Sequence, residues 1–305
     1  MNLSKKIIFS LENIYISPLE LCNLNCKYCY TKKTKNILSN KQILSFIKRY
    51  NNYLKAIRKH DFFSTLSLVT DSPEKKNYVE NCEIKLKSII FCGGEVFTLK
   101  NFPRLVNNLI SQNIFITIIT NGTIDKLGKI KDPKNCQLIV SFDGPQKIHD
   151  QNRGRGNFAK SKNFVKHALK LGFPVEIFYL ITKDSYPYRN KLNIFGLKKT
   201  YLTDRLGSLT SRQVKNIRQN YPVYPPKNFG CAMLSLQSDG KFYPCCESNK
   251  AIGSLSDPLS KILLNYSTIY LKNPLCPDPD YFCNFKNEVN NFSERNHPSG
   301  VCTRA

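Results

Sequence analysis

The sequence predicts an α/β fold, a partial (β/α)6 TIM-like barrel followed by a small C-terminal module, and two observations lead to this prediction. Apolar, strand-like runs alternate with stretches of helical periodicity through the first two-thirds of the chain. Motifs rich in cysteine, glycine and asparagine follow directly after several of these runs, at the place where parallel strands carry functional loops. Five or six strand–helix units are too few to close a full eight-stranded barrel.

Each expected strand rests on an apolar run, and each expected helix on the spacing of its apolar residues. The expected strands cover residues 14–21, 86–92, 114–120, 137–142, 174–182 and 198–203. The expected helices cover residues 39–58, 101–112 and 157–171, and a short helix is expected after residue 122. Residues 60–84 are polar and irregular, which is typical of an insertion or an extended loop.

The last third of the chain has a different pattern and predicts a second unit. The predicted division is a domain over 1–204, a polar, proline-containing linker over 205–230 and a C-terminal domain over 231–305. In the C-terminal domain, a hairpin is expected at 233–237 and 241–243, because Asp239-Gly240 is a preferred hairpin turn. A helix is expected over 258–271.

The charge and hydropathy of the 305-residue chain exclude some classes of protein. The net charge of +24 is compatible with a nucleic-acid surface or with a lysine-rich composition. Because the lysines are scattered, with no basic block among aromatic residues, we expect no nucleic-acid partner. No apolar run approaches the length of a membrane span, and no signal-peptide cleavage site is visible, so the chain is expected to be cytoplasmic.

Twelve cysteines indicate metal or redox chemistry, since disulfides are disfavoured in the cytosol. Three of them lie within eight residues near the start, and six follow residue 230. Cys82, Cys92 and Cys136 lie between the two groups and are expected to be buried, small apolar residues.

The first group reads Cys22-Asn-Leu-Asn-Cys26-Lys-Tyr28-Cys29. Three thiolates on one loop can bind three irons of a [4Fe–4S] cluster and leave one iron open for chemistry. A structural zinc site is the alternative, but it needs four ligands, and no fourth cysteine or histidine follows nearby.

This loop resembles the CxxxCxxC signature of the radical S-adenosylmethionine (SAM) superfamily, including the aromatic Tyr28 before the last cysteine. Further motifs resemble that family in the same order along the chain, over about residues 14–182. They are Gly93-Gly94-Glu95, Thr120-Asn121-Gly122-Thr123, and Ser141-Phe142-Asp143-Gly144-Pro145 with His149 and Arg153. Val96 stands where the family usually has proline, a departure that affects the stiffness of the loop.

The resemblance implies roles for these residues. Cys22, Cys26 and Cys29 hold the catalytic cluster, and Glu95 helps to hold the ammonium group of SAM. Ser141 and Arg153 contact its ribose and carboxylate, while Asp143 touches substrate or ribose. His149 is either a proton donor or a surface or turn residue. The implied cofactor-binding set is Tyr28, Gly93, Gly94, Glu95, Asn121, Ser141, Asp143 and Arg153.

The second cysteine group resembles the SPASM or twitch modules of this family, which bind auxiliary clusters. Cys231 and Cys245 enclose the expected hairpin, with the spacing G-x4-C from Gly240 to Cys245. Six cysteines are too few for two fully thiolate-bound clusters, so one auxiliary [4Fe–4S] cluster is expected. The expected ligands are Cys231, Cys245, Cys276 and Cys283, with Cys302 or Cys246 as replacements. A zinc site with the same ligands is the alternative.

The resemblance implies an enzyme that reductively cleaves SAM to a 5′-deoxyadenosyl radical, which then takes a hydrogen atom from a substrate. The expected substrate is a peptide or protein, and the expected electron donor is of the flavodoxin or ferredoxin type. The outcomes left open are a thioether or carbon–carbon crosslink, epimerisation, or oxidation of Cys or Ser. The alternatives are a nucleotide or sugar substrate, or a non-catalytic iron–sulfur or zinc protein that binds nucleic acid.

Overall fold

The computed structural model describes residues 11–29, 31–56, 84–203, 208–223, 233–246 and 248–272. These residues form one nine-stranded sheet in the order β6-β5-β4-β3-β2-β1-β7-β8-β9. The strands are β1 Asn13–Ile16, β2 Ser88–Phe91, β3 Phe115–Thr120, β4 Cys136–Phe142, β5 Val175–Ile181, β6 Lys199–Thr203, β7 Ser235–Leu236, β8 Lys241–Tyr243 and β9 Gly253–Ser254. The helices are α2 Asn40–Ala56, α5 Phe102–Ile110, α6 Gln146–Arg153, α7 Asn157–Lys170, α8 Ser211–Asn220 and α9 Leu259–Lys272.

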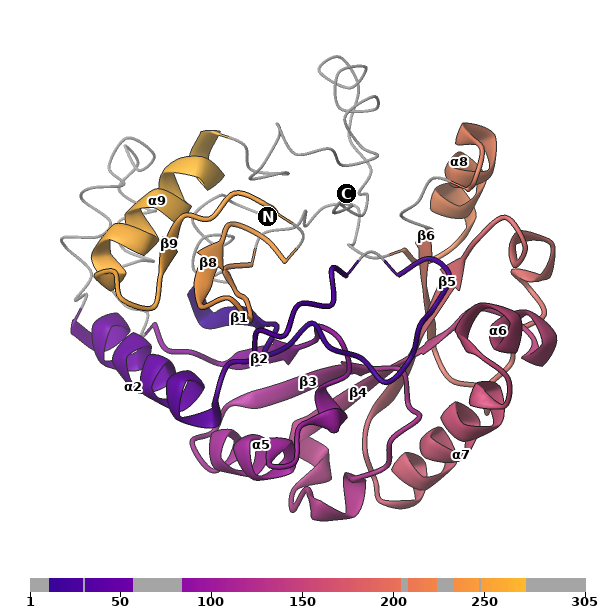
Figure 1. Ribbon diagram of the computed structural model, residues 1–305, viewed down its shortest axis with the longest axis horizontal. Helices are drawn as coiled ribbons and strands as arrows, with labels where there is room; N and C mark the ends of the chain where they lie inside the picture. The colour runs from indigo at the N-terminus through magenta and orange to yellow at the C-terminus, as the bar shows by residue number, and fades with distance from the viewer. Residues whose placement is uncertain are drawn as a thin grey trace, which may run out of the picture.

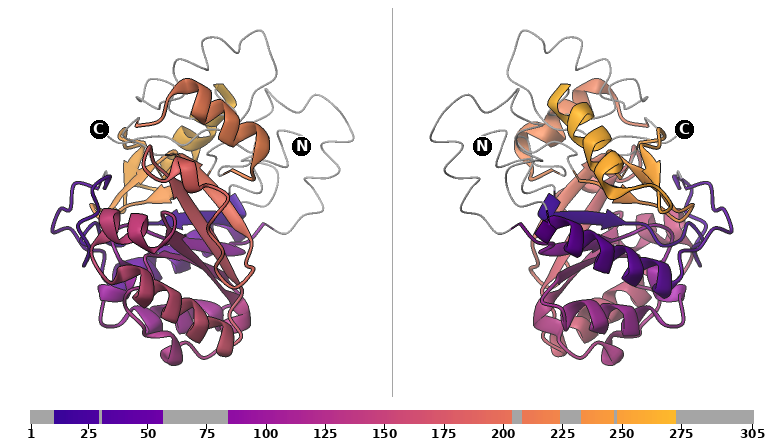
Figure 2. Two further views of the ribbon diagram at one scale, coloured as in Figure 1. Left: turned by 90° about the vertical axis from the view of Figure 1, so that its right-hand side faces the viewer. Right: turned by 90° about the vertical axis from the view of Figure 1, so that its left-hand side faces the viewer.

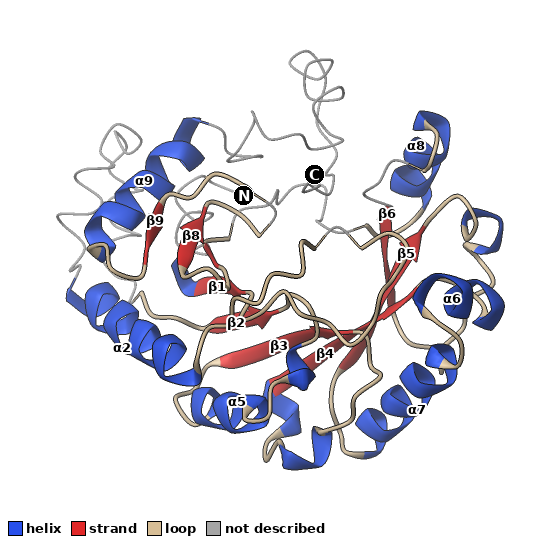
Figure 3. Ribbon diagram, viewed as in Figure 1, coloured by secondary structure: helices blue, strands red, loops and turns tan. Residues whose placement is uncertain are grey.

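The sheet is curved, and helices α2, α5 and α7 cover its convex face (Figure 1). Figure 2 shows the same arrangement from two sides, and Figure 3 distinguishes its helices from its strands. Strands β1 to β6 are parallel to their neighbours throughout, so their carboxyl ends lie at one edge. The expected α/β class with a parallel sheet is confirmed. In the described part of the chain, no helix combines the length and apolarity needed to cross a bilayer.

Alternation along the strands separates two apolar layers. In β5, Ile177, Tyr179 and Ile181 are completely buried in the large core shared with the helices. The residues between them point to the concave face, where Phe178 packs in a small cluster that includes Leu202. The concave face is therefore apolar in the region of β5 and β6.

The sequence predicted most of these elements but not helices α6 and α8 or the two-residue strand β9. All six expected parallel strands are present, although β1 and β2 are shorter than expected because their chains turn away into loops. The expected short helix after residue 122 is a 3-10 turn, η3 Leu127–Lys129. Helix α6 was not expected, and α8 lies within the range 205–230 for which we predicted a linker.

The expected hairpin is present, and it extends the same sheet. Strand β7 runs parallel to β1, with Tyr15 opposite Ser235, and antiparallel to β8. Phe242 on β8 is completely buried, and its ring centroid lies 5.0 Å from that of Phe46 on α2. A separate cluster-binding module over 231–305 stays a prediction. Four of its expected cysteines lie outside the described residues: Cys231, Cys276, Cys283 and Cys302.

Replacing Phe242 with alanine tests whether the hairpin is part of the core. We expect Phe242→Ala to lower the free energy of unfolding by about 3 to 5 kcal/mol, because it leaves a cavity beside Phe46. Leu264→Ala is the control, since this side chain on α9 is half exposed, and its effect should stay within about 0.5 kcal/mol. Urea denaturation measures both, and equal effects would mean that the hairpin packs loosely.

Candidate active site

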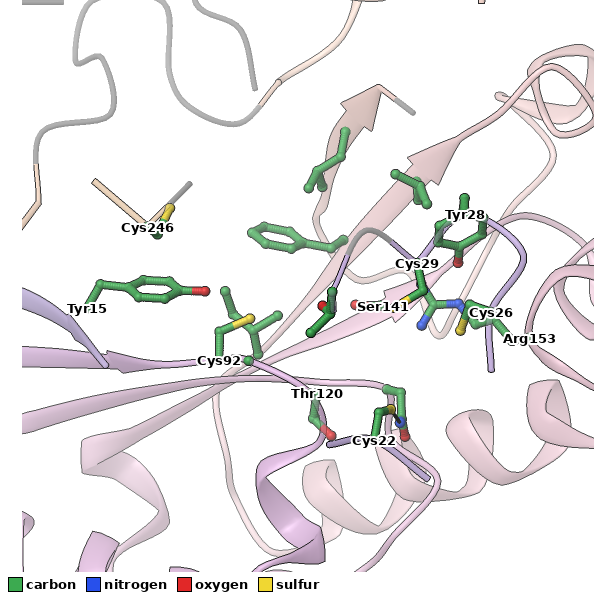
Figure 4. Close-up of a pocket in the computed structure, with 18 residues that line it drawn as sticks. Tyr15, Cys22, Cys26, Tyr28, Cys29, Cys92, Thr120, Ser141, Arg153 and Cys246 are labelled. Carbon is green, nitrogen blue, oxygen red and sulfur yellow. Dashed lines mark hydrogen bonds between the residues drawn. The ribbon is translucent and has the colours of Figure 1, made fainter. Parts of the chain in front are cut away.

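The three cysteines of the first group lie in the segment that follows β1 and line a single cavity. Cys22, Cys26 and Cys29 are half-buried, and the cavity measures about 190 Å³ (Figure 4). The amide of Cys29 donates to the carbonyl of Cys26 at 3.1 Å, and the amide of Leu24 donates to Sγ of Cys22 at 3.4 Å. The loop's own backbone thus turns its thiols toward the cavity.

The two glycines after β2 let this loop lie directly on the end of the sheet. A Cβ atom on Gly93 would lie 2.2 Å from the carbonyl oxygen of Leu19, and one on Gly94 would lie 1.9 Å from that of Leu21. The amides of Gly94 and Glu95 donate to the same two oxygens, at 2.9 and 3.0 Å. Any side chain at Gly93 or Gly94 would therefore push the cysteine loop away.

Glu95 points into the protein. Its carboxylate is completely buried and accepts hydrogen bonds from the Phe97 amide at 3.1 Å, and from the Thr120 hydroxyl and the Asn121 amide at 2.9 Å. Burial raises the pKa of Glu95, and these hydrogen bonds act in the opposite direction. This orientation differs from the expected one toward a ligand ammonium, because a buried carboxylate needs donors on every side.

Asn121 connects the loop after β3 to the cysteine loop. Its side-chain amide donates to Asn23 Oδ1 at 3.0 Å and to Sγ of Cys22 at 3.7 Å. Its own side-chain oxygen accepts from the Thr123 amide at 2.9 Å. The expected strand-end turn therefore also orients one of the thiols.

A buried charged cluster joins the cysteine loop to the end of β4. Asp143 accepts from Nε of Arg153 at 2.9 Å and from the hydroxyl of Tyr28. Burial raises the pKa of Asp143, and the charge of Arg153 counters that effect. Asp143 lies behind the cavity wall, whereas Arg153 and Tyr28 line it. Asp143 therefore supports the two residues that reach the cavity.

Helix α6, which the sequence analysis missed, positions this cluster. The Lys27 amide donates to the carbonyl of Asn152 at 3.1 Å, which ties the cysteine loop to α6. The Asp150 carboxylate accepts from the amides of Gly156 at 3.0 Å and Phe158 at 2.8 Å, and so organises the start of α7. Asp150 lies within α6, six residues before Gly156, so no local capping pattern in the sequence indicated this turn.

Both alternatives considered for His149 are wrong. The side chain is completely buried and lies outside the cavity. Its ring centroid is 5.2 Å from that of Phe142 and 5.6 Å from that of Phe158. Neither ring nitrogen has a hydrogen-bond partner. Burial, helped by the nearby charge of Arg153, lowers the pKa of His149 to about 3. His149 is therefore a neutral core residue at physiological pH.

The cavity wall contains residues that the sequence did not place beside the cysteine loop, among them Cys246, which was expected as a replacement ligand of the auxiliary cluster. Ile119, Phe178, Leu180 and Leu202 form an apolar part of the wall, and Tyr15, Cys92 and Cys246 also line the cavity. Cys92 was expected to be buried in the core, but it is half-buried at the cavity. The alternation of side chains along a strand could have indicated that Cys92 faces the cavity, since the preceding residue, Phe91, packs in the large core shared with the helices. Cys136 is completely buried, as expected.

The cavity brings together most of the expected cofactor-binding residues. Those that line it are Tyr28, Gly93, Gly94, Asn121, Ser141 and Arg153. Glu95 and Asp143 lie behind the wall, and Cys245 is buried beside it.

The three loop thiols match the number of protein ligands that a [4Fe–4S] cluster with one open iron needs. In the described ranges, no three His, Cys, Asp or Glu side chains converge on one metal-ion position. Burial raises the pKa of Cys22, and it raises that of Cys26 to about 11 against the opposing charge of Arg153. Metal binding at this loop must therefore displace protons.

Comparisons with known proteins show the family to which the chain belongs. A family model of the Radical SAM superfamily matches residues 16–186, more than half of the chain. The radical SAM cyclopropyl synthase TigE of Paramaledivibacter caminithermalis is 26% identical over 198 residues, which are 62% of this chain and 39% of that protein. This chain thus spans about two-fifths of the length of that curated relative.

Two groups of solved structures share the fold. Native anSMEcpe with bound AdoMet and Cp18Cys peptide aligns with a TM-score of 0.62 and 19% identity, over 84% of this chain and 81% of the other. Streptococcus suis SuiB bound to the precursor peptide SuiA aligns with a TM-score of 0.61 and 14% identity, over 88% and 68%.

Removing the carboxylate of Asp143 tests the buried cluster. Asp143→Ala should lower the free energy of unfolding by about 3 to 5 kcal/mol, because it leaves the Arg153 charge buried without its partner. The control is Lys198→Ala, which breaks a surface pair with Glu176 at 3.5 Å and should cost less than about 1 kcal/mol. Chemical denaturation compares the two, and a small effect at Asp143 would contradict the assigned role.

The buried His149 predicts a pH dependence of stability. Between pH 6.5 and about 3, the unfolded chain protonates this histidine and the folded protein does not, so acidification destabilises the fold. His149→Phe removes this contribution. On going from pH 7 to pH 5, the free energy of unfolding of the wild type should fall by about 2 kcal/mol more than that of the variant. Urea denaturation at both pH values measures the difference, and equal losses would exclude a depressed pKa.

Proposed function

The chain belongs to the radical SAM superfamily, and we propose that it is a peptide-modifying member, which removes a hydrogen atom from a peptide or protein substrate. One observation carries this proposal. A single cavity is lined by the three loop cysteines, by the cation Arg153 and by an apolar wall from the concave face of the sheet. A reactive centre and an apolar substrate group could therefore meet in one cavity.

Residues of the cysteine loop, of β4 and of α6 would bind the two cofactors. Cys22, Cys26 and Cys29 would hold a [4Fe–4S] cluster, which together with SAM supplies a 5′-deoxyadenosyl radical when both are bound. Arg153 presents a guanidinium to the cavity with its other side held by Asp143, which suits the carboxylate of SAM. Ser141 lines the same cavity and would contact the ribose.

The apolar wall would position the substrate and exclude water. Ile119, Phe178, Leu180 and Leu202 offer no polar side-chain group, so they suit a hydrocarbon part of a substrate residue. Exclusion of competing groups matters here, because the radical could otherwise take hydrogen from a C–H or S–H bond that is not the intended one.

Similar proteins support a peptide as the substrate class. The solved structures of anSMEcpe and SuiB contain peptides, and TigE is named a cyclopropyl synthase. The net charge of +24 would attract an acidic electron-transfer protein of the flavodoxin or ferredoxin class. We include in the proposal one auxiliary [4Fe–4S] cluster held by Cys231, Cys245, Cys276 and Cys283.

Anaerobic reconstitution with iron and sulfide tests the enzymatic part of the proposal. We expect about eight irons per chain and formation of 5′-deoxyadenosine from SAM under a low-potential reductant. The triple variant Cys22→Ala, Cys26→Ala, Cys29→Ala should lose about half of the iron and all SAM cleavage. Cys136→Ala, which removes a thiol from the core, should retain both. Zinc in place of iron would overturn the proposal.

The substrate class is tested separately with synthetic peptides encoded by short reading frames beside the gene. A peptide substrate should raise the yield of 5′-deoxyadenosine and change in mass or stereochemistry. A response to nucleotides or sugars, and to no peptide, would assign the small-molecule alternative instead.

A further inference from the structure

Two cysteines outside the cluster motif line the same cavity as the three loop thiols. They are Cys92, after β2, and Cys246, after β8. In Figure 4, Cys246 lies on the side of the cavity away from Cys26 and Cys29. The cavity thus has thiols on the side of the proposed cluster and a further thiol across from it.

The hairpin fixes the position of Cys246. Cys245 is 1% exposed and packs inward, while the next residue, Cys246, is half-buried and lines the cavity. The side-chain amide of Gln237 donates to the carbonyl of Cys246 at 3.5 Å. The hairpin itself is anchored to β1, where the amide of Tyr15 donates to the carbonyl of Leu234 at 2.9 Å. Cys246 is therefore held by the same sheet that carries the cysteine loop.

The surroundings of Cys246 suit the transfer of a hydrogen atom. The wall of the cavity also includes Ile119, Phe178, Leu180 and Leu202, whose side chains offer only C–H bonds. A thiol gives a hydrogen atom to a carbon radical far more readily than such hydrocarbon groups do. Cys92 has a different setting, because it directly precedes the Gly93-Gly94 turn on which the cysteine loop lies.

We propose that Cys246 is a catalytic residue that donates a hydrogen atom to carbon radicals formed in this cavity. This inference rests on the proposed function and deepens it. A hydrogen atom removed on the cluster side and returned from the hairpin side would invert the configuration of a substrate carbon. The enzyme would then be a peptide epimerase.

The transfer oxidises the thiol of Cys246 to a thiyl radical, which a reductant must convert back to the thiol. The S–H bond of Cys246 breaks, a C–H bond forms on the substrate, and a thiyl radical remains on sulfur. One electron and one proton return it to the thiol. The electron comes from the same class of low-potential, one-electron donor that starts the reaction, and the proton comes from solvent. Each turnover therefore consumes one SAM and two electrons.

The reconstituted full-length protein in D2O tests this directly, with SAM as the only substrate and titanium(III) citrate as the reductant. The thiol of Cys246 exchanges to S–D, so we expect 5′-deoxyadenosine that carries one deuterium. Cys246→Ala should lower the deuterated fraction at least fivefold, while Cys136→Ala should leave it unchanged. Mass spectrometry of the nucleoside measures the fraction independently of the amount formed.

The other outcomes separate this inference from the proposed function. Deuterium that persists in Cys246→Ala, or that is lost only in Cys92→Ala or Tyr15→Phe, would overturn the role of Cys246 and leave SAM cleavage intact. Absence of 5′-deoxyadenosine would overturn both.

A second measurement needs no cofactor. Brief alkylation of the unloaded protein with iodoacetamide should label Cys246 and spare Cys245 and Cys136. Protection of Cys246 would contradict a thiol that faces the cavity.

Discussion

The contact of the Gly93-Gly94 turn with the carbonyl groups of Leu19 and Leu21 is the constraint on which the site depends. Two backbone segments approach so closely there that no Cβ atom fits between them. Because the segment that contains Leu19 and Leu21 leads directly into Cys22, this contact determines how far the cysteine loop lies from the end of the sheet. Glu95 extends the constraint to the next strand, since its buried carboxylate binds Thr120 and the Asn121 amide. Asn121 in turn reaches Sγ of Cys22, so three successive strand ends determine one sulfur position.

Burial and charge act against each other throughout this site. Burial alone disfavours every ionised form, and it raises the pKa of Cys26 to about 11. Arg153 opposes this effect at Cys26 and at Asp143. Because Asp143 already accepts from Nε of Arg153, the guanidinium is oriented before any ligand arrives. A thiolate or a carboxylate that enters the cavity therefore meets a preorganised cation.

The sequence predicted those features that depend on local pattern. Apolar runs and strand-end turns were sufficient for the six parallel strands, and the cysteine spacing was sufficient for the loop that lines the cavity. The orientation of Glu95, the burial of His149 and the exposure of Cys92 to the cavity were not predicted. The first two are decided by which tertiary neighbours satisfy or exclude a side chain. The alternation of side chains along β2 could have indicated that Cys92 faces the cavity. Nothing in the local sequence indicated the hydrogen-bond donors that surround Glu95.

The hairpin explains how a sheet of six parallel strands can surround a cavity at all. Such a sheet leaves the β1 edge unpaired, and an unpaired edge exposes backbone groups. Strand β7 pairs with that edge in parallel, and β8 then folds back against α2 through Phe242 and Phe46. The same pairing that covers the edge brings residue 246 to the cavity. The C-terminal segment therefore contributes to the wall of the site as a direct consequence of completing the sheet, and the chemistry on that side of the cavity depends on which residue follows β8.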